Sequence, residues 1–165
     1  MFLLLASAFG LTFSWAGKKE MFRGPLGWIA RRLGGIAVDR SGPADLVSQV
    51  AEEFRRRDAL RFVLAPSGTR SRTDYWKSGF YHIALAARVP VVLGILDYAK
   101  REGGFGPVLR LTGDVRGDME TIRSFYAGVT PYRPENAGPI RLRSEGGPGE
   151  SPREARTRGT EPSEL

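Results

Sequence analysis

A turn rich in hydroxyl groups, Ala65–Ser71, is the part of the sequence best suited to chemistry. An apolar run, Phe62–Ala65, leads into it. The candidate binding residues of the turn are the consecutive Ser67, Gly68, Thr69 and Arg70. A planar guanidinium beside free backbone N–H groups binds a phosphate well. The turn is therefore a candidate site for a phosphorylated ligand, and the alternative is a plain strand-to-helix connection with a solvated arginine.

Two further cations are expected near this turn. Lys77 stands just before a predicted helix that starts at Gly79, where free N–H groups also favour anions. Arg40 follows a short predicted strand, Ile36–Val38. Because ligands bind at the carboxyl ends of strands in open α/β sheets, the cations are predicted to converge on one pocket. In particular, Arg40 and Arg70 are predicted to meet although they lie far apart in the sequence.

The elements that must position these residues alternate between strand and helix. The predicted helices are Phe2–Phe9, Pro25–Leu33, one that starts near Pro43, Gly79–Arg88 and Arg116–Tyr126. The predicted strands are Leu11–Ala16, Ile36–Val38, Phe62–Ala65, Val91–Leu96 and Val108–Leu111, with a loop at Lys100–Gly104. In the predicted helix that starts at Gly79, Ser78 is expected to be the N-cap. This order predicts an α/β fold, a layered domain with a mostly parallel sheet flanked by helices.

Length and composition predict one folded domain and a tail. The chain has 165 residues, of which 41% are hydrophobic, so residues 1–143 are expected to form a globular domain. Residues 144–165 are charged and almost free of apolar side chains, and are expected to be disordered. The absence of cysteine excludes disulfides, cysteine nucleophiles and thiolate metal sites. No cluster of carboxylates around the single histidine suggests a metal site.

The charge of the chain predicts an anionic partner. The net charge is +7 and the tail is slightly acidic, so the body of the domain is strongly basic. Such a body attracts phosphorylated substrates, anionic lipid headgroups or nucleic acid, although the charge also serves solubility. No nucleic-acid motif is present, so nucleic acid is not expected as a partner. Lys18, Lys19 and Arg23 follow the uncharged segment Met1–Gly17, which predicts a cytoplasmic domain bound peripherally to an anionic membrane surface.

Three blocks of the sequence, in this order, resemble the glycerolipid acyltransferase family of the 1-acylglycerol-3-phosphate type. The blocks are Gly34–Arg40, Ala65–Ser71 and Val89–Ile95, and the resemblance runs from about Phe9 to about Arg143. It implies an enzyme of phospholipid biosynthesis that moves a fatty acyl group to the hydroxyl of a glycerol-phosphate or lysophospholipid-type acceptor. The acyl donor would be a thioester of coenzyme A or acyl carrier protein, and no bound cofactor is implied. The family uses the positions of Arg40 and Gly68–Arg70 for the glycerol phosphate.

The departures from this family concern catalysis. The family's catalytic His-x4-Asp block is absent, because Ala87 stands five residues after the single histidine, His82. Ser67 stands where the family has Glu, and Leu93 where it has a second Pro. We therefore expect a domain that begins just after its catalytic motif and is inactive as it stands, with no catalytic residue of its own and His82 in a structural or capping role. A misassigned start is one explanation, and a catalytically dead module that binds lipid or acyl donor is the alternative.

Overall fold

The structure of the chain, a computed structural model, describes residues 10, 12–39, 43–69 and 71–145. The α-helices in this part are α2 (Pro25–Arg32), α3 (Pro43–Arg56), α4 (Gly79–Ala87) and α5 (Val115–Tyr126). The strands are β1 (Trp15–Lys18), β2 (Gly35–Val38), β3 (Val91–Asp97) and β4 (Glu102–Leu109). Short 3-10 helices are η1 (Lys19–Phe22), η2 (Pro134–Asn136) and η3 (Arg143–Glu145). The predicted helix Phe2–Phe9 and the predicted tail beyond Glu145 lie outside the described residues.

The N-terminal part has the predicted parallel pairing. β1 and β2 are parallel, with Trp15 opposite Gly35. The segment that follows α3 pairs with the residue just before β1, through a parallel bridge between Phe62 and Ser14. Phe62–Ala65 contributes this bridge in place of the full strand that was predicted. Parallel segments joined by α2 and α3 are compatible with the predicted α/β class.

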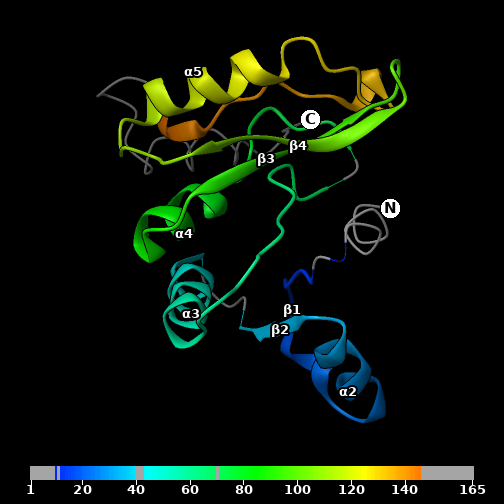
Figure 1. Ribbon diagram of the computed structural model, residues 1–165, viewed down its shortest axis with the longest axis vertical. Helices are drawn as coiled ribbons and strands as arrows, with labels where there is room; N and C mark the ends of the chain where they lie inside the picture. Colours follow the sequence, from blue (N-terminus) through cyan, green and yellow to red (C-terminus); the bar gives the residue numbers. More distant parts are fainter. Residues whose placement is uncertain (1–9, 11, 40–42, 70, 146–165) are drawn as a thin grey trace, which may run out of the picture.

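The C-terminal part corrects the prediction of a mostly parallel sheet. β3 and β4 are antiparallel, with Val91 opposite Leu109. The connection between them, Tyr98–Arg101, is too short for the crossover that a parallel pair needs. β4 begins at Glu102, within the segment predicted as a loop. The sequence did not indicate this start, because its glycine-rich residues show no alternation of apolar and polar side chains. The molecule therefore combines one parallel and one antiparallel sheet (Figure 1).

Two apolar clusters form the core, and α4 contributes to both. The Met119 cluster consists of Tyr81, Leu93, Met119, Ile122 and Leu142, and α5 lies along β3 and β4 to close it (Figure 1). The Val50 cluster consists of Ile36, Val38, Val50 and Ile83, beneath α3. Since Tyr81 and Ile83 both lie on α4, this helix joins the two halves of the fold.

A buried hydrogen-bond network fixes α4 against the start of α5. The Tyr81 hydroxyl donates to Asp118 Oδ2 over 2.7 Å, and the backbone N–H of Thr112 donates to the same oxygen over 2.9 Å. Burial alone would raise the pKa of Asp118, but these hydrogen bonds favour the charged form and hold its pKa below the ordinary value. Burial and the bond to Asp118 raise the pKa of Tyr81. At neutral pH the network therefore holds an ionised Asp118 and a neutral Tyr81.

Candidate functional site

The turn Pro66–Thr69 follows directly on the segment that pairs with Ser14. The Val63 N–H donates to the Ser14 carbonyl over 2.8 Å, which fixes the chain just before the turn. Within the turn, the Gly68 N–H donates to the Ala65 carbonyl over 3.0 Å, and Gly68 has a φ of 65°. A side chain would strain the backbone in this left-handed conformation, so the turn requires glycine here.

Lys77 returns to this turn from the far end of the loop. Its backbone N–H donates to the Pro66 carbonyl over 2.8 Å. Its side chain lies over Gly68, since a Cβ built on that glycine would stand 2.9 Å from Lys77 Cε and 3.0 Å from Nζ. The side chain is exposed, and no carboxylate in the described part of the chain pairs with its ammonium group. Within the described part of the chain, the positive charge that lies directly over the turn is therefore uncompensated.

The hydroxyl groups of Ser67 and Thr69 stabilise the turn through hydrogen bonds to its backbone. The half-buried Ser67 hydroxyl donates to the Thr69 carbonyl over 3.2 Å. The Thr69 hydroxyl oxygen accepts the Ser71 N–H over 3.2 Å. Because the Ser67 hydroxyl donates its proton within the turn, its oxygen keeps lone pairs that can accept a hydrogen bond from a ligand.

The N-terminus of α4 lies immediately beyond Lys77. The Ser78 carbonyl accepts the N–H groups of Tyr81 and His82 over 3.0 Å and 3.1 Å. The prediction that Ser78 caps the helix is wrong for its side chain, which makes no capping hydrogen bond. Its backbone has helical angles, φ −72° and ψ −1°, where a capping residue is normally extended. The side chain of Ser78 thus accepts none of the first-turn N–H groups of α4.

Arg40 and Arg70 lie outside the described residues, so their meeting stays a prediction. The chain before Arg40 is fixed, because the Asp39 N–H donates to Gln49 Oε1 over 3.0 Å. Gln49 Nε2 donates in turn to the Asp39 carbonyl over 3.2 Å. Arg70 follows Thr69 in the turn just described. Both arginines thus adjoin anchored residues at the ends of segments that pair in parallel.

His82 is exposed on α4. Its ring stands edge-on to that of Tyr81, with the two ring centroids 6.0 Å apart. No carboxylate among the described residues contacts the imidazole. A histidine without an acid partner lacks the group that orients a catalytic base in a triad-like arrangement.

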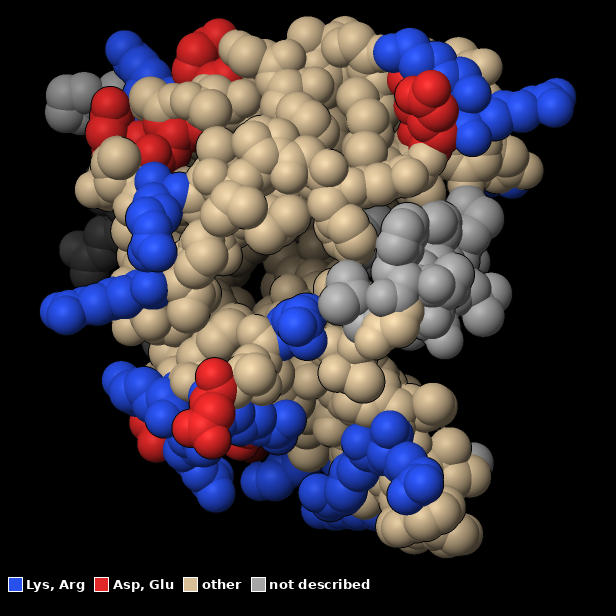
Figure 2. Space-filling view, viewed as in Figure 1, with Lys and Arg blue, Asp and Glu red and all other residues tan. Residues whose placement is uncertain are grey.

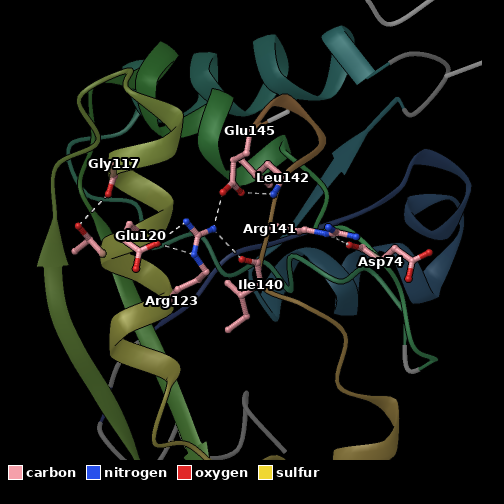
Figure 3. A network of polar contacts seen from close by, with 9 residues as sticks. Asp74, Gly117, Glu120, Arg123, Ile140, Arg141, Leu142 and Glu145 are labelled. Atoms are coloured by element: carbon pink, nitrogen blue, oxygen red, sulfur yellow. Dashed lines mark hydrogen bonds and ion pairs between the residues drawn. The ribbon is translucent and has the colours of Figure 1, made fainter. Parts of the chain in front are cut away.

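A segment near the C-terminus supports the loop from behind, and sequence reasoning missed it. This C-terminal strap comprises residues 137–143. Arg141 Nε donates to the Asp74 carbonyl over 3.0 Å (Figure 3). The Trp76 N–H donates to the Arg141 carbonyl over 2.8 Å. The guanidinium of Arg141 also lies 4.5 Å from the ring centroid of Tyr75. The loop before Lys77 is therefore tied to a segment more than sixty residues further along the chain.

The strap touches the loop at two further points. Arg72 Nη1 donates to the Ala137 carbonyl over 2.9 Å. At Gly138 the two backbones approach so closely that a Cβ would stand 1.9 Å from the Thr73 carbonyl oxygen. In sequence the strap shows only an alternation of apolar and basic residues, Ile140–Arg143, which is typical of a half-buried extended segment. Its partner could not be read from that pattern.

Arg123 on α5 fixes the strap in turn. Its Nη1 donates to the Ile140 carbonyl over 3.2 Å, and the same guanidinium pairs with Glu120 and Glu145 (Figure 3). Glu145 also accepts the N–H of the buried Leu142. Hydrogen bonds to these carboxylates raise the pKa of Arg123. The strap therefore connects the loop to the Met119 cluster.

An apolar cavity of about 780 Å³ borders the turn at Pro66. It lies between the two halves of the molecule, which is hollowed near its middle in Figure 2. Most of its wall comes from the chain around Phe62, from α4 and from β3, and its lining includes Phe62, Leu64, Trp76, Phe80, Leu93 and Tyr126. Arg57, Asp58 and Arg61 add charged groups to the wall. The cavity suits a hydrocarbon with a polar end. No group of three or more potential metal ligands occurs in the part of the chain that the structure describes.

A family described as Acyltransferase matches residues 2–93, which is more than half of the chain. The chain belongs to the Acyltransferase family. The match covers the turn, Lys77, α4 and the first part of β3, so it includes the part of the site that bears the candidate binding residues. The strap, β4 and α5 lie beyond it.

Named members of this family are similar to the chain. A 1-acyl-sn-glycerol-3-phosphate acyltransferase of Limnanthes douglasii is 36% identical over 97 residues, which are 53% of this chain and 34% of the relative. One of Cocos nucifera is 35% identical over 85 residues, which are 48% of this chain and 28% of the relative. The chain thus spans about a third of the length of the curated relatives it matches. No solved structure matches the chain.

Proposed function

We propose that this chain carries the acceptor-binding part of an acyltransferase of phospholipid biosynthesis. The enzyme would move a fatty acyl group from a thioester of coenzyme A or acyl carrier protein to a glycerol-phosphate or lysophospholipid-type hydroxyl. The observation that carries the proposal is the ammonium group of Lys77, which pairs with no carboxylate among the described residues and lies over the Pro66–Thr69 turn, beside an apolar cavity. A phosphate and a hydrocarbon chain are the two parts of such an acceptor.

The phosphate would lie over the turn. Lys77 supplies a point charge there, and Arg40 and Arg70 are proposed to supply guanidinium groups from either side. The backbone N–H group of Thr69 would contribute as such groups do in other anion-binding turns, since the Gly68 N–H is bonded to the Ala65 carbonyl. Ser67 would accept a hydrogen bond from the glycerol without adding the negative charge of a carboxylate. The apolar cavity that begins at Pro66 would take the hydrocarbon of acceptor or donor.

The transfer step needs a base that this sequence lacks. The acceptor hydroxyl oxygen attacks the thioester carbonyl carbon and loses its proton to a base, the carbon–sulfur bond breaks, and the thiol leaves. The only histidine, His82, is exposed and has no acid partner among the described residues. We therefore propose that the 165-residue chain binds acceptor and does not turn it over.

Calorimetry with glycerol 3-phosphate and a short-chain lysophosphatidate tests the binding proposal. Lys77→Ala should weaken both ligands about tenfold or more, because a charge-assisted hydrogen bond contributes about 1.5–3 kcal/mol. Arg110→Ala removes an equal charge from an exposed position outside the site and should leave the affinity unchanged. An equal loss of ligand affinity in both variants would mean that only the net charge of the protein matters, and it would refute a site at the turn.

A second candidate function, a catalytically dead module that binds lipid or acyl donor, is favoured by the isolation of His82. Thiol release from acyl-coenzyme A in the presence of lysophospholipids tests the inactivity that both candidates share. Binding without thiol release supports both the missing base and a binding role. Turnover at the rate of a full-length family member would contradict the proposal of inactivity and point to His82.

We further propose that the protein associates peripherally with an anionic membrane from the cytoplasmic side. Its net charge of +7 supports electrostatic attraction to such a surface. Within the residues that the structure describes, no helix has the length and apolar character needed to span a bilayer.

A further inference from the structure

Four large apolar side chains gather on the outer side of η1 and α2. Met21 is 53% exposed, Trp28 66%, Ile29 47% and Leu33 66%. They come from a stretch of thirteen residues and are called the α2 face from here on. Isolated exposed apolar side chains are ordinary, but a group of four that includes tryptophan marks an interaction surface.

Helical geometry explains why this face points outward. α2 rests on η1 with Gly27, which is buried against the backbone of Phe22. At 100° per residue, Trp28, Ile29 and Leu33 span the opposite arc of the helix. In Figure 1, α2 stands at the end of the molecule remote from α5. The side chains on this arc therefore cover no part of the two core clusters.

Exposed cations surround the α2 face. They are Lys18, Lys19, Arg23, Arg31 and Arg32, and Glu20 is the single acidic residue between Trp15 and Leu33. The guanidinium of Arg32 lies 5.7 Å from the ring centroid of Trp28. The lower right lobe of Figure 2, where α2 lies in the same view of Figure 1, shows blue side chains next to uncharged surface. Apolar side chains with tryptophan, bordered by arginine and lysine, are the composition of a segment that lies in the plane of a membrane interface.

We propose that the α2 face inserts into the headgroup and upper acyl region of a bilayer that contains anionic phospholipid. The choice of a lipid occupant rests on the proposed function, because an enzyme that modifies membrane lipids must approach their surface. The local excess of positive charge also excludes a basic partner and disfavours pairing of the face with a second copy of itself. The cations hold the protein at the headgroups, and Trp28, Ile29 and Leu33 supply the part of the binding that salt does not screen.

Co-sedimentation of the full chain with vesicles tests this surface. Vesicles of phosphatidylcholine with one third phosphatidylglycerol should bind the chain much better than phosphatidylcholine alone, and less at high salt. The triple variant Trp28→Ser, Ile29→Ser, Leu33→Ser should weaken vesicle binding by at least about tenfold, because it removes the apolar surface that would be buried in the bilayer. Arg32→Ala should weaken binding about fivefold. Circular dichroism verifies that each variant remains folded.

The matched control is Val108→Ser with Tyr132→Ser, which removes apolar side chains of equal exposure away from α2. This variant should bind vesicles like the wild type. Equal losses in both variants, or a triple variant that binds normally, would overturn the proposal. A dimer of the wild type that the triple variant abolishes would assign the face to a second copy instead.

The result is separable from the acceptor site. The triple variant should bind glycerol 3-phosphate normally, and Lys77→Ala should bind vesicles nearly normally. If the wild type binds vesicles through the α2 face but fails to bind glycerol 3-phosphate, the proposed function fails and the membrane surface stands. The reverse result would retain the acceptor site and refute the surface.

Discussion

The Met119 cluster and the Val50 cluster both bury their central side chains completely, yet their polar surroundings differ. Beside Met119, the buried Asp118 accepts hydrogen bonds from Tyr81 and Thr112. Beside Val50, the ion pairs lie at the surface of α3, as in the 2.6 Å contact of Arg55 with Glu52. Exposed pairs contribute little to stability, whereas a buried charge that loses its partners is costly. Specific polar bonding is thus concentrated in the C-terminal half.

This difference locates what positions the candidate turn. The strap connects the loop before Lys77 to the Met119 cluster. The C-terminal half therefore determines where Lys77 lies, although the segment that leads into the turn belongs to the N-terminal half. The α2 face, at the other extreme, has no partner in the described part of the fold and is available for an external surface.

Asp118→Ala should cause the largest loss, about 3 kcal/mol of unfolding free energy. The change leaves the buried Tyr81 hydroxyl and the Thr112 N–H without their acceptor. Urea unfolding monitored by circular dichroism gives the value. Asp114→Ala is the control, because that exposed carboxylate makes no capping hydrogen bond and should cost less than about 1 kcal/mol. Similar losses in the two variants would remove the contrast between buried and exposed carboxylates.

Gly138→Ala should destabilise the protein by about 1–3 kcal/mol, since its Cβ would collide with the Thr73 carbonyl. Because this contact holds the loop before Lys77, glycerol 3-phosphate should also bind less tightly. Gly128→Ala, with no atom within 4 Å of its added Cβ, should change neither quantity. Weaker stability with unchanged ligand affinity would show that the strap supports the fold without positioning the turn.

Stability should fall in acid partly through Asp118. Its folded pKa lies below its ordinary value, so its contribution is present above the unfolded pKa of about 3.9 and is lost as the pH falls through the folded pKa. Asp97, whose pKa is lowered by the N–H of Lys100, adds to the same loss. Unfolding free energies measured between pH 7 and pH 2 should decline less steeply in Asp118→Asn. An unchanged slope would assign the acid sensitivity to other carboxylates.

Trp28→Ser should have the smallest effect on stability, within about 0.5 kcal/mol, because this side chain is 66% exposed. Thermal and urea unfolding measure it. A loss above about 2 kcal/mol, typical of a buried aromatic, would mean that the residue is packed in the folded protein. That result would contradict the contrast between the buried network around Met119 and the exposed α2 face.

The sequence allowed most helices to be placed, because their ends carry local signals. Proline begins α2 and α3, and the glycine pair after α2 ends that helix before β2. The class of fold follows from the alternation of elements. β4 was missed in part because Glu102–Gly106 carries no apolar alternation, and its antiparallel pairing follows from a short connection that only the structure shows.

The candidate site was predictable in composition and less so in geometry. The turn was recognised from Pro66 to Thr69, since proline, glycine and hydroxyl residues act locally. The contact of Lys77 with Gly68 depends on how the loop between them folds back, and the hydrogen bond of Arg141 to Asp74 is long-range in sequence. Arginine side chains that bind backbone carbonyls leave no periodic trace in a sequence, so no pattern pointed to the strap.

The sharing of α4 between the two clusters has a consequence for unfolding. Tyr81 cannot leave the Met119 cluster without withdrawing Ile83 from the Val50 cluster, because both lie on one short helix. Partial opening of one half therefore exposes apolar side chains of the other, which couples the two halves into one cooperative transition. Backbone amides of α4 should accordingly exchange with solvent deuterium only through global unfolding, and those at the ends of α2 through local opening.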